Sequence, residues 1–142
     1  EEMNNCLVFA FTSMLFAGFT SVIAKKGLTG ISGDLGVTVR TCFVFLFMLG
    51  FAWSAVPQKD WAELKPNNWL WLSASALTTT LSWIFYYRAI KLGEVSTVAL
   101  IDKGSVVVSV VLACWLLHEA LTVPKLAGAL LICAGLVVIS KG

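Results

Sequence analysis

Long stretches of apolar residues, with few charged residues inside them, alternate with short polar segments along this chain. A helix that crosses the hydrocarbon core of a bilayer, which is about 30 Å thick, needs about 20 mostly apolar residues. Five stretches approach this length, and each ends at or beside a charged residue or a proline. The pattern therefore predicts five transmembrane helices, over residues 6–26, 35–56, 68–90, 95–117 and 123–140.

The composition supports this assignment to a membrane. Of the 142 residues, 58% are hydrophobic and 13% are charged, and the mean hydropathy is +0.88. Soluble domains are typically about 45–50% apolar and about 25% charged. A soluble bundle of these helices would need a polar outer layer, and too few polar residues remain to form one. We therefore expect an all-α integral membrane protein, a bundle of five transmembrane helices in one membrane domain over residues 1–142.

The basic residues give a weak indication of orientation. Five helices place the two termini on opposite sides of the bilayer, and cytoplasmic loops carry an excess of Lys and Arg. Three basic residues lie on the side of the N-terminus: Lys59, Lys65 and Lys125. Six lie on the other side: Lys25, Lys26, Arg40, Arg88, Lys91 and Lys141. The count favours an N-terminus outside, but without Arg40 and Arg88 it falls to three against four, so insertion in both orientations stays open.

Several charged residues lie inside the predicted spans or close to their ends. Asp102, Lys103 and Arg40 lie within spans, whereas Lys25 and Arg88 lie near span ends. A charge at the bilayer centre costs about 2.5–3.5 kcal/mol on insertion scales, so such residues usually face a partner or a polar cavity. Asp102 and Lys103 are neighbours, about 100° apart on a helix, so we expect them to face different directions.

Two interpretations of these charges are open. In the first, Asp102 pairs with Arg40, Lys25 or Arg88 of another helix, and the pair only orients the helices of the bundle. In the second, the charges line a polar cavity that binds a substrate or a coupling proton. A third interpretation, for Lys103 alone, is that its ammonium reaches the membrane surface without a further role.

Polar and aromatic residues recur on single helix faces and add candidates for the cavity. Trp83 and Tyr86 share a face with hydroxyl residues, Tyr87 follows directly, and Ser105 shares a face with Asp102. Small and hydroxylated residues also join membrane helices without any other role. Gly128 and Gly135 are seven residues apart and predict a close-packing face for another helix or a second copy of the chain.

The sequence contains no pattern typical of catalysis or metal binding. The four cysteines, Cys6, Cys42, Cys114 and Cys133, form no CxxC pair, and His118 is the single histidine. A zinc site would need Cys or His residues in clusters. We therefore expect no catalytic residue, no metal, no cofactor and no nucleic-acid partner.

The order and spacing of several motifs resemble the EamA-type half of the drug/metabolite transporter superfamily, in its single-repeat, five-helix bacterial and archaeal branch. The motifs are YRAIKLG at 87–93, EALT at 119–122 and the pair Gly128-Ala129, with Gly18 and Lys25 in the first helix. The chain departs from the family in two respects. It has Gly104 where many members carry proline, and it has one repeat where most members have two.

This resemblance implies a transporter that works by alternating access, with its site between two inverted repeats. A second copy in the opposite orientation would supply the missing repeat. We therefore expect a multi-pass protein of a bacterial or archaeal inner membrane, surrounded by lipid. It would act as an antiparallel homodimer that moves a small polar or amphipathic metabolite, driven by an ion or proton gradient. The alternative is a non-transporting membrane subunit or assembly factor whose buried charges only pair helices.

Overall fold

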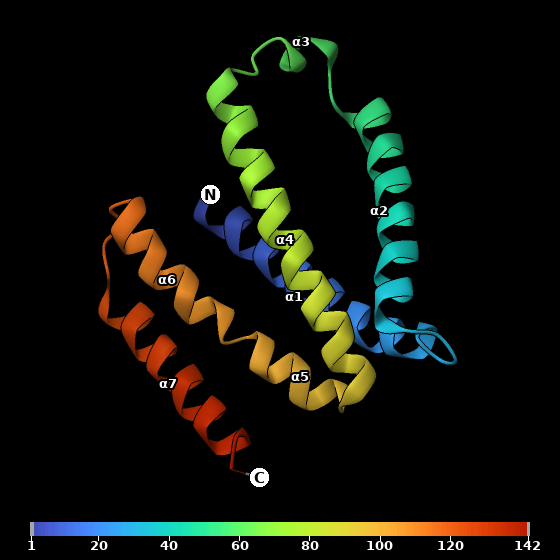
Figure 1. The fold of residues 1–142 in the computed structure, drawn as a ribbon. Helices are drawn as coiled ribbons and strands as arrows, with labels where there is room; N and C mark the ends of the chain where they lie inside the picture. The colour runs from blue at the N-terminus through green and yellow to red at the C-terminus, as the bar shows by residue number, and fades with distance from the viewer. Residues whose placement is uncertain (1, 142) are drawn as a thin grey trace. The chain divides into compact units, whose positions relative to one another are not determined.

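The computed structural model describes residues 2–141. Within that range all the regular secondary structure is α-helical, as Figure 1 shows. The expectation of an all-helical protein is therefore confirmed for these residues. In chain order the helices are α1 Glu2–Gly27, α2 Gly33–Ala55, α3 Gln58–Trp61, α4 Pro66–Leu92, α5 Val95–Asp102, α6 Ser105–Leu116 and α7 Val123–Ile139.

Within residues 2–141, three segments are long and apolar enough to cross a membrane: α1, α2 and the segment Val95–Leu116 that contains α5 and α6. The other two predicted spans correspond to α4 and α7. With 27 residues α4 is long enough, but its many Ser, Thr, Trp and Tyr side chains make it less apolar. With 17 residues α7 is about 25 Å long, slightly less than a typical hydrocarbon core.

The segment predicted as one helix over residues 95–117 is interrupted near its first third. α5 ends at Asp102 and α6 begins at Ser105. Between them the backbone bonds connect residues three apart, from Gly104 N to Ile101 O at 2.9 Å and from Val107 N to Gly104 O at 3.0 Å. This tighter spacing is that of a 3₁₀ turn, which often marks a hinge or a local distortion in a helix.

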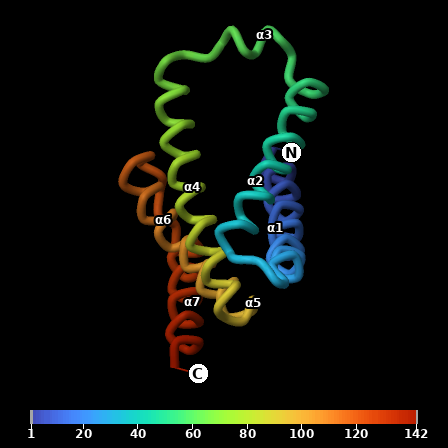
Figure 2. The backbone as a smooth tube through the Cα atoms, turned by 45° about the vertical axis from the view of Figure 1, so that its right-hand side comes forward, coloured from blue at the N-terminus to red at the C-terminus, as the bar shows by residue number. Residues whose placement is uncertain are grey.

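The chain divides into two compact units, one up to Leu92 and one from Gly93 onward. In the first unit α2 packs against α4, and in the second α7 contacts both α5 and α6. Figure 2 shows that α2 and α4 are far apart where α3 connects them and converge toward their opposite ends. The short helix α3 lies between two prolines, Pro57 and Pro66, in the connection between the predicted spans 35–56 and 68–90.

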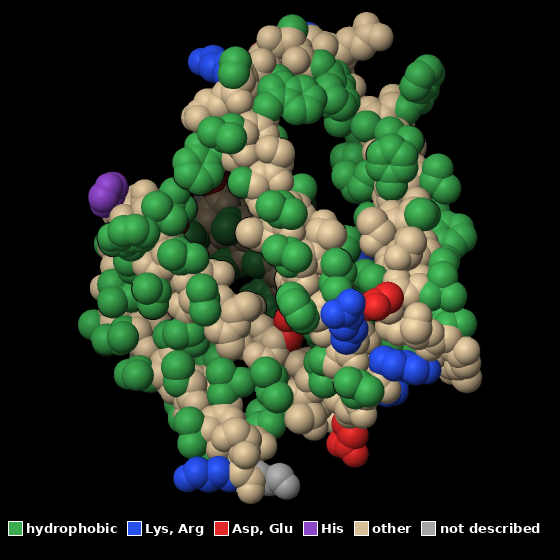
Figure 3. Space-filling view, in the orientation of Figure 1, with side chains coloured by type: hydrophobic (Ala, Val, Ile, Leu, Met, Phe, Trp, Pro, Cys, Tyr) green, Lys and Arg blue, Asp and Glu red, His purple; other side chains and the backbone are tan. Residues whose placement is uncertain are grey.

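The buried core of the first unit lies where α2 and α4 converge. Leu28, Val37, Tyr87 and Ile90 are the buried hydrophobic residues, with Ile90 completely inaccessible. Most other large apolar side chains point outward, and Trp53 is 94% exposed. Figure 3 shows hydrophobic side chains over much of the visible surface of α2 and α4. A surface of this kind suits lipid or another protein rather than water.

The connection between α6 and α7 turns at a residue with an unusual backbone conformation. His118 has φ 54°, in the left-handed region that non-glycine residues seldom adopt. The backbone N–H of Glu119 donates to Ala113 O at 3.3 Å, which closes the end of α6. This arrangement corresponds to the helix-ending turn in which glycine usually occupies the left-handed position.

Candidate functional site

The site begins where the first residues of α2 meet the end of α4. The side chain of Ser32 caps α2, because its Oγ accepts a hydrogen bond from Leu35 N at 3.2 Å. Gly33 follows, and a Cβ at this position would lie 2.9 Å from the backbone oxygen of Tyr87. The absence of a side chain at Gly33 therefore allows the backbones of α2 and α4 to approach closely.

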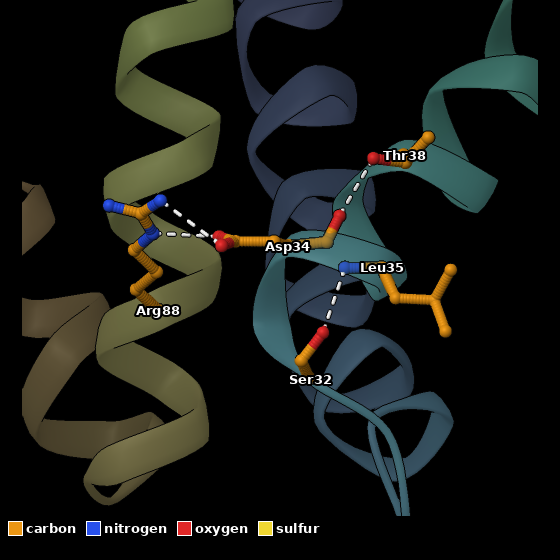
Figure 4. Close-up of polar contacts among 5 residues, drawn as sticks. All are labelled: Ser32, Asp34, Leu35, Thr38 and Arg88. Carbon is orange, nitrogen blue, oxygen red and sulfur yellow. Dashed lines mark hydrogen bonds and ion pairs between the residues drawn. The ribbon is translucent and has the colours of Figure 1, made fainter.

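An ion pair joins the same two helices, as Figure 4 shows. Asp34 Oδ1 accepts a hydrogen bond from Arg88 Nε at 2.7 Å, and Asp34 Oδ2 accepts one from Arg88 Nη2 at 3.1 Å. Both side chains are more than half exposed. The partner expected for Arg88 from the sequence is Asp102, and Asp34 is not among the predicted site residues. Asp34 lies in the first turn of α2, where a carboxylate also interacts favourably with the helix dipole.

Arg40 lies two turns further along α2, against the aromatic side chains of α4. Its guanidinium carbon is 4.3 Å from the centre of the Trp83 ring and 5.9 Å from that of Tyr87. Both distances are within the range of cation–π attraction. The Nη1 atom of Arg40 is buried and has no hydrogen-bond partner among the residues that the structure describes. The structure therefore brings together three of the predicted site residues, with the Arg40 guanidinium against the rings of Trp83 and Tyr87.

The end of α1 is bound to the end of α4 by reciprocal lysine contacts. Lys25 Nζ donates to the backbone oxygen of Ile90, and Lys91 Nζ donates to that of Leu28 at 2.9 Å. Carbonyl groups at the end of a helix lack partners within the helix, and lysine side chains often bind them. Lys25 therefore contacts a backbone carbonyl group of α4, and a pair between Lys25 and Asp102 stays a prediction.

Another hydrogen bond joins α1 to α4 further from the ends. The Tyr86 hydroxyl donates to Ser21 Oγ at 2.8 Å, and both groups are partly buried. Tyr86 was a candidate for a ligand-facing wall, and in this structure its hydroxyl group faces α1. Its polar end is thus used in packing between helices.

A cavity of about 380 Å³ lies between α1 and α2 and reaches Tyr87 of α4. Small-molecule sites typically have volumes of about 300–1,000 Å³. Most lining residues are apolar or glycine, among them Ile23, Val39 and Phe43. Arg40 is the charged residue in this lining, so the cavity combines one cationic group with an apolar wall.

The remaining candidates belong to the second unit and lie around the interruption between α5 and α6. Lys103 Nζ is 3.9 Å from Asp102 Oδ2, and both side chains are well exposed. The expectation that these neighbours face different directions is therefore not met, because the turn between the helices and the length of the lysine side chain bring their ends together. Ser105 begins α6 directly after this turn.

The two glycines predicted to form a close-packing face have open space in front of them. A Cβ at Gly128 or Gly135 would meet no atom within 4 Å among the described residues. Gly104 differs, because a Cβ there would lie 2.9 Å from Leu136 Cδ1 of α7. Within the second unit, close helix contact therefore occurs at Gly104, and a partner for Gly128 and Gly135 stays a prediction.

Comparison with known proteins decides the family. The model of the EamA-like transporter family matches residues 4–141. The chain belongs to the EamA-like transporter family. A Sinorhizobium protein named as an uncharacterized transporter in the cobO 3′ region is 32% identical over 127 residues, which cover 89% of this chain and 90% of the relative. No solved structure matches the chain significantly.

This result confirms the resemblance to the EamA family and makes the chain a multi-pass membrane protein of a transporter family. The matched region extends over both units, so both carry family sequence. The Sinorhizobium relative has a similar length to this chain, since the alignment covers nearly the same share of each.

Proposed function

We propose that this EamA-family protein moves a small polar or amphipathic metabolite across the membrane by alternating access, as an antiparallel homodimer coupled to an ion or proton gradient. In this proposal residues 1–142 act as one membrane domain, and α1, α2, α4, α5–α6 and α7 are its five spans. The observation that carries the proposal is the cavity between α1 and α2, with Arg40 in its wall. Family membership supports transport in general.

Three observations support a second copy in the opposite orientation. The family model matches residues 4–141, and the alignment with the Sinorhizobium relative covers nearly the same share of both chains, 89% and 90%. The surface is rich in exposed apolar side chains, which include Phe47 and Trp53, and space is open in front of Gly128 and Gly135. The distribution of basic residues favours neither orientation strongly, as dual insertion requires.

Asp102 is the proposed coupling group. It is an acidic residue inside a candidate span, and it lies where the helix is interrupted. Interrupted helices commonly provide ion and substrate sites in secondary transporters. The ammonium of Lys103 lies 3.9 Å from Asp102 Oδ2. In this proposal an incoming cation replaces that ammonium as the partner of the carboxylate.

The antiparallel dimer is tested with variants of fixed orientation. Extra lysines in the loop after α1 would direct that loop to the cytoplasm. Extra lysines in the loop around α3 would direct the α3 loop to the cytoplasm instead, and so place the loop after α1 outside. A single cysteine at Thr29 or Glu63, in a background without Cys6, Cys42, Cys114 and Cys133, reports the orientation by labelling from each side. We expect each fixed form to be inactive alone and the two forms to copurify and function together. Function of one fixed form alone would contradict the antiparallel dimer.

Transport and coupling are tested in proteoliposomes that contain a fluorescent pH indicator. A panel of anionic, neutral and cationic metabolites is added outside, and the internal pH is followed. We expect at least one solute class to drive proton movement, Asp102→Asn to abolish it, and the matched control Asp60→Asn to leave it unchanged. If no solute in the panel moves, the proposed transport function is wrong, and the non-transporting subunit is favoured. If Asp102→Asn retains proton coupling, the coupling role proposed for Asp102 is wrong.

A further inference from the structure

Arg40 differs in its contacts from Arg88, Lys91 and Lys25, three other basic residues at its end of the first unit. Arg88 is bound to Asp34 through two hydrogen bonds, and Lys91 is bound to a backbone oxygen. Lys25 also donates to a backbone oxygen. The Arg40 guanidinium instead lies against two aromatic rings, and its buried Nη1 atom has no hydrogen-bond acceptor among the described residues.

No carboxylate of this part of the chain is left to neutralise Arg40. Asp34 is the only acidic residue between residues 3 and 59, and none occurs between residues 64 and 93. Both carboxylate oxygens of Asp34 already accept hydrogen bonds from Arg88. The acidic residues of the α3 loop, Asp60 and Glu63, lie beyond the other end of α2.

An isolated cation within a membrane span is costly, so it normally has a partner or a function. Arg40 is seven residues from the start of α2, which corresponds to about 10 Å along the helix. Cation–π contacts with Trp83 and Tyr87 offset part of this cost and hold the planar group in place. They leave the guanidinium N–H groups without the anionic acceptors to which arginine binds best.

The cavity beside Arg40 is suited to an anion that also has an apolar part. Its other lining residues are mostly hydrocarbon, so a strongly hydrated multivalent ion would lose its water without enough replacement. A carboxylate attached to a hydrocarbon body would place the charge at Arg40 and the body against Ile23, Val39 and Phe43. The Thr20 hydroxyl is a further polar group in the lining, although it donates to Phe16 O at 2.8 Å.

We infer that the cavity between α1 and α2 binds small monocarboxylates with an apolar body, and that Arg40, stacked on Trp83, binds their carboxylate. The inference rests on the proposed function and specifies its substrate class. It assigns to Arg40 a role that is separate from the coupling role proposed for Asp102.

Direct binding to the purified protein in nanodiscs tests this inference without depending on transport. The probes are phenylacetate, phenylacetamide and phenethylammonium, which share a phenyl group on a short chain but differ in charge. Isothermal titration gives Kd for each probe. We expect phenylacetate to bind at least tenfold more tightly than either of the other two, because only its carboxylate matches Arg40.

Variants then locate the bound carboxylate. Arg40→Gln should weaken phenylacetate binding at least tenfold, and Arg40→Lys should weaken it less, because the charge remains but paired hydrogen bonding is lost. Lys26→Gln removes an exposed charge from the same end of the unit but does not touch the cavity, and we expect it to bind phenylacetate like the unmodified protein. The melting temperature of each variant in nanodiscs shows whether it is folded.

Several results would overturn the inference. They are equal binding of phenylacetate and phenylacetamide, tighter binding of phenethylammonium, no binding of phenylacetate, or unchanged binding in folded Arg40→Gln. Each of these leaves the proposed transport function standing if another solute moves in proteoliposomes. Conversely, phenylacetate binding that depends on Arg40, without transport of any solute, would refute the proposed function and retain the binding site.

Discussion

Replacing Gly33 with alanine tests whether the close approach of α2 and α4 holds the first unit together. The new methyl carbon would lie 2.9 Å from Tyr87 O, 3.1 Å from Tyr87 C and 3.2 Å from Arg88 Cα. All three are backbone atoms, so no side-chain rotation can relieve the contact. Favourable separations are about 3.5–4.0 Å, so the helices would have to move apart by roughly 0.5 Å.

The expected cost follows from these contacts. Overfilling a packed site typically costs about 1–3 kcal/mol. Alanine gains up to about 1 kcal/mol over glycine in a helix interior, and less at the first residue of a helix. We therefore expect Gly33→Ala to lower the free energy of unfolding by about 1–2 kcal/mol. The matched control is Gly50→Ala in the same helix, where a Cβ meets no described atom within 4 Å.

Equilibrium unfolding by SDS, from mixed detergent micelles, measures both variants by tryptophan fluorescence. Gly33→Ala should unfold at a lower SDS fraction than the unmodified protein, and Gly50→Ala should unfold at the same or a higher fraction. If Gly33→Ala is as stable as Gly50→Ala, then the backbones of α2 and α4 are not as close as the structure has them, and the geometry assigned to the site is wrong.

The same SDS titration checks three further predictions. Asp34→Asn should reduce stability, the loss should shrink at high salt because the pair with Arg88 is exposed, and exchanging the two charges should restore part of it. Ser32→Ala removes the side-chain acceptor for Leu35 N and should cost about 1 kcal/mol, whereas Ser32→Asp should not. His118→Gly should gain about 1 kcal/mol by relieving the positive φ, whereas His118→Ala should gain nothing.

Most of the helical structure could be predicted from the sequence because the physical signal is long and continuous. An apolar stretch must hydrogen-bond its own backbone in a membrane, which leaves the helix as the natural choice. The predicted ranges 35–56 and 123–140 agree with α2 and α7 within about two residues. The interruption at Gly104 was harder to predict, since glycine within an apolar helix is common and the close contact with Leu136 comes from a distant part of the chain.

The site was predicted only in part, for a reason that Asp34 illustrates. Charged residues in the middle of a span attract attention because they are costly there, whereas an acidic residue in the first turn of a helix is ordinary. Nothing local in the sequence indicates that its partner is Arg88, 54 residues away. In the SGD sequence at residues 32–34, Ser32 caps α2, Gly33 allows close packing, and Asp34 forms the ion pair. Only the cap could be predicted from the neighbouring residues in the sequence.

The pairing of Asp34 with Arg88 also changes the interpretation of Arg40. From the sequence alone, every basic residue at this end of the first unit is an equal candidate for an ion pair with a carboxylate. Arg88 occupies both oxygens of Asp34, and Lys25 and Lys91 bind backbone carbonyl groups, whereas the buried Nη1 atom of Arg40 has no acceptor among the described residues. Because Arg40 is also the charged residue in the wall of the cavity, the monocarboxylate that we infer as its ligand would supply an anionic acceptor for the guanidinium.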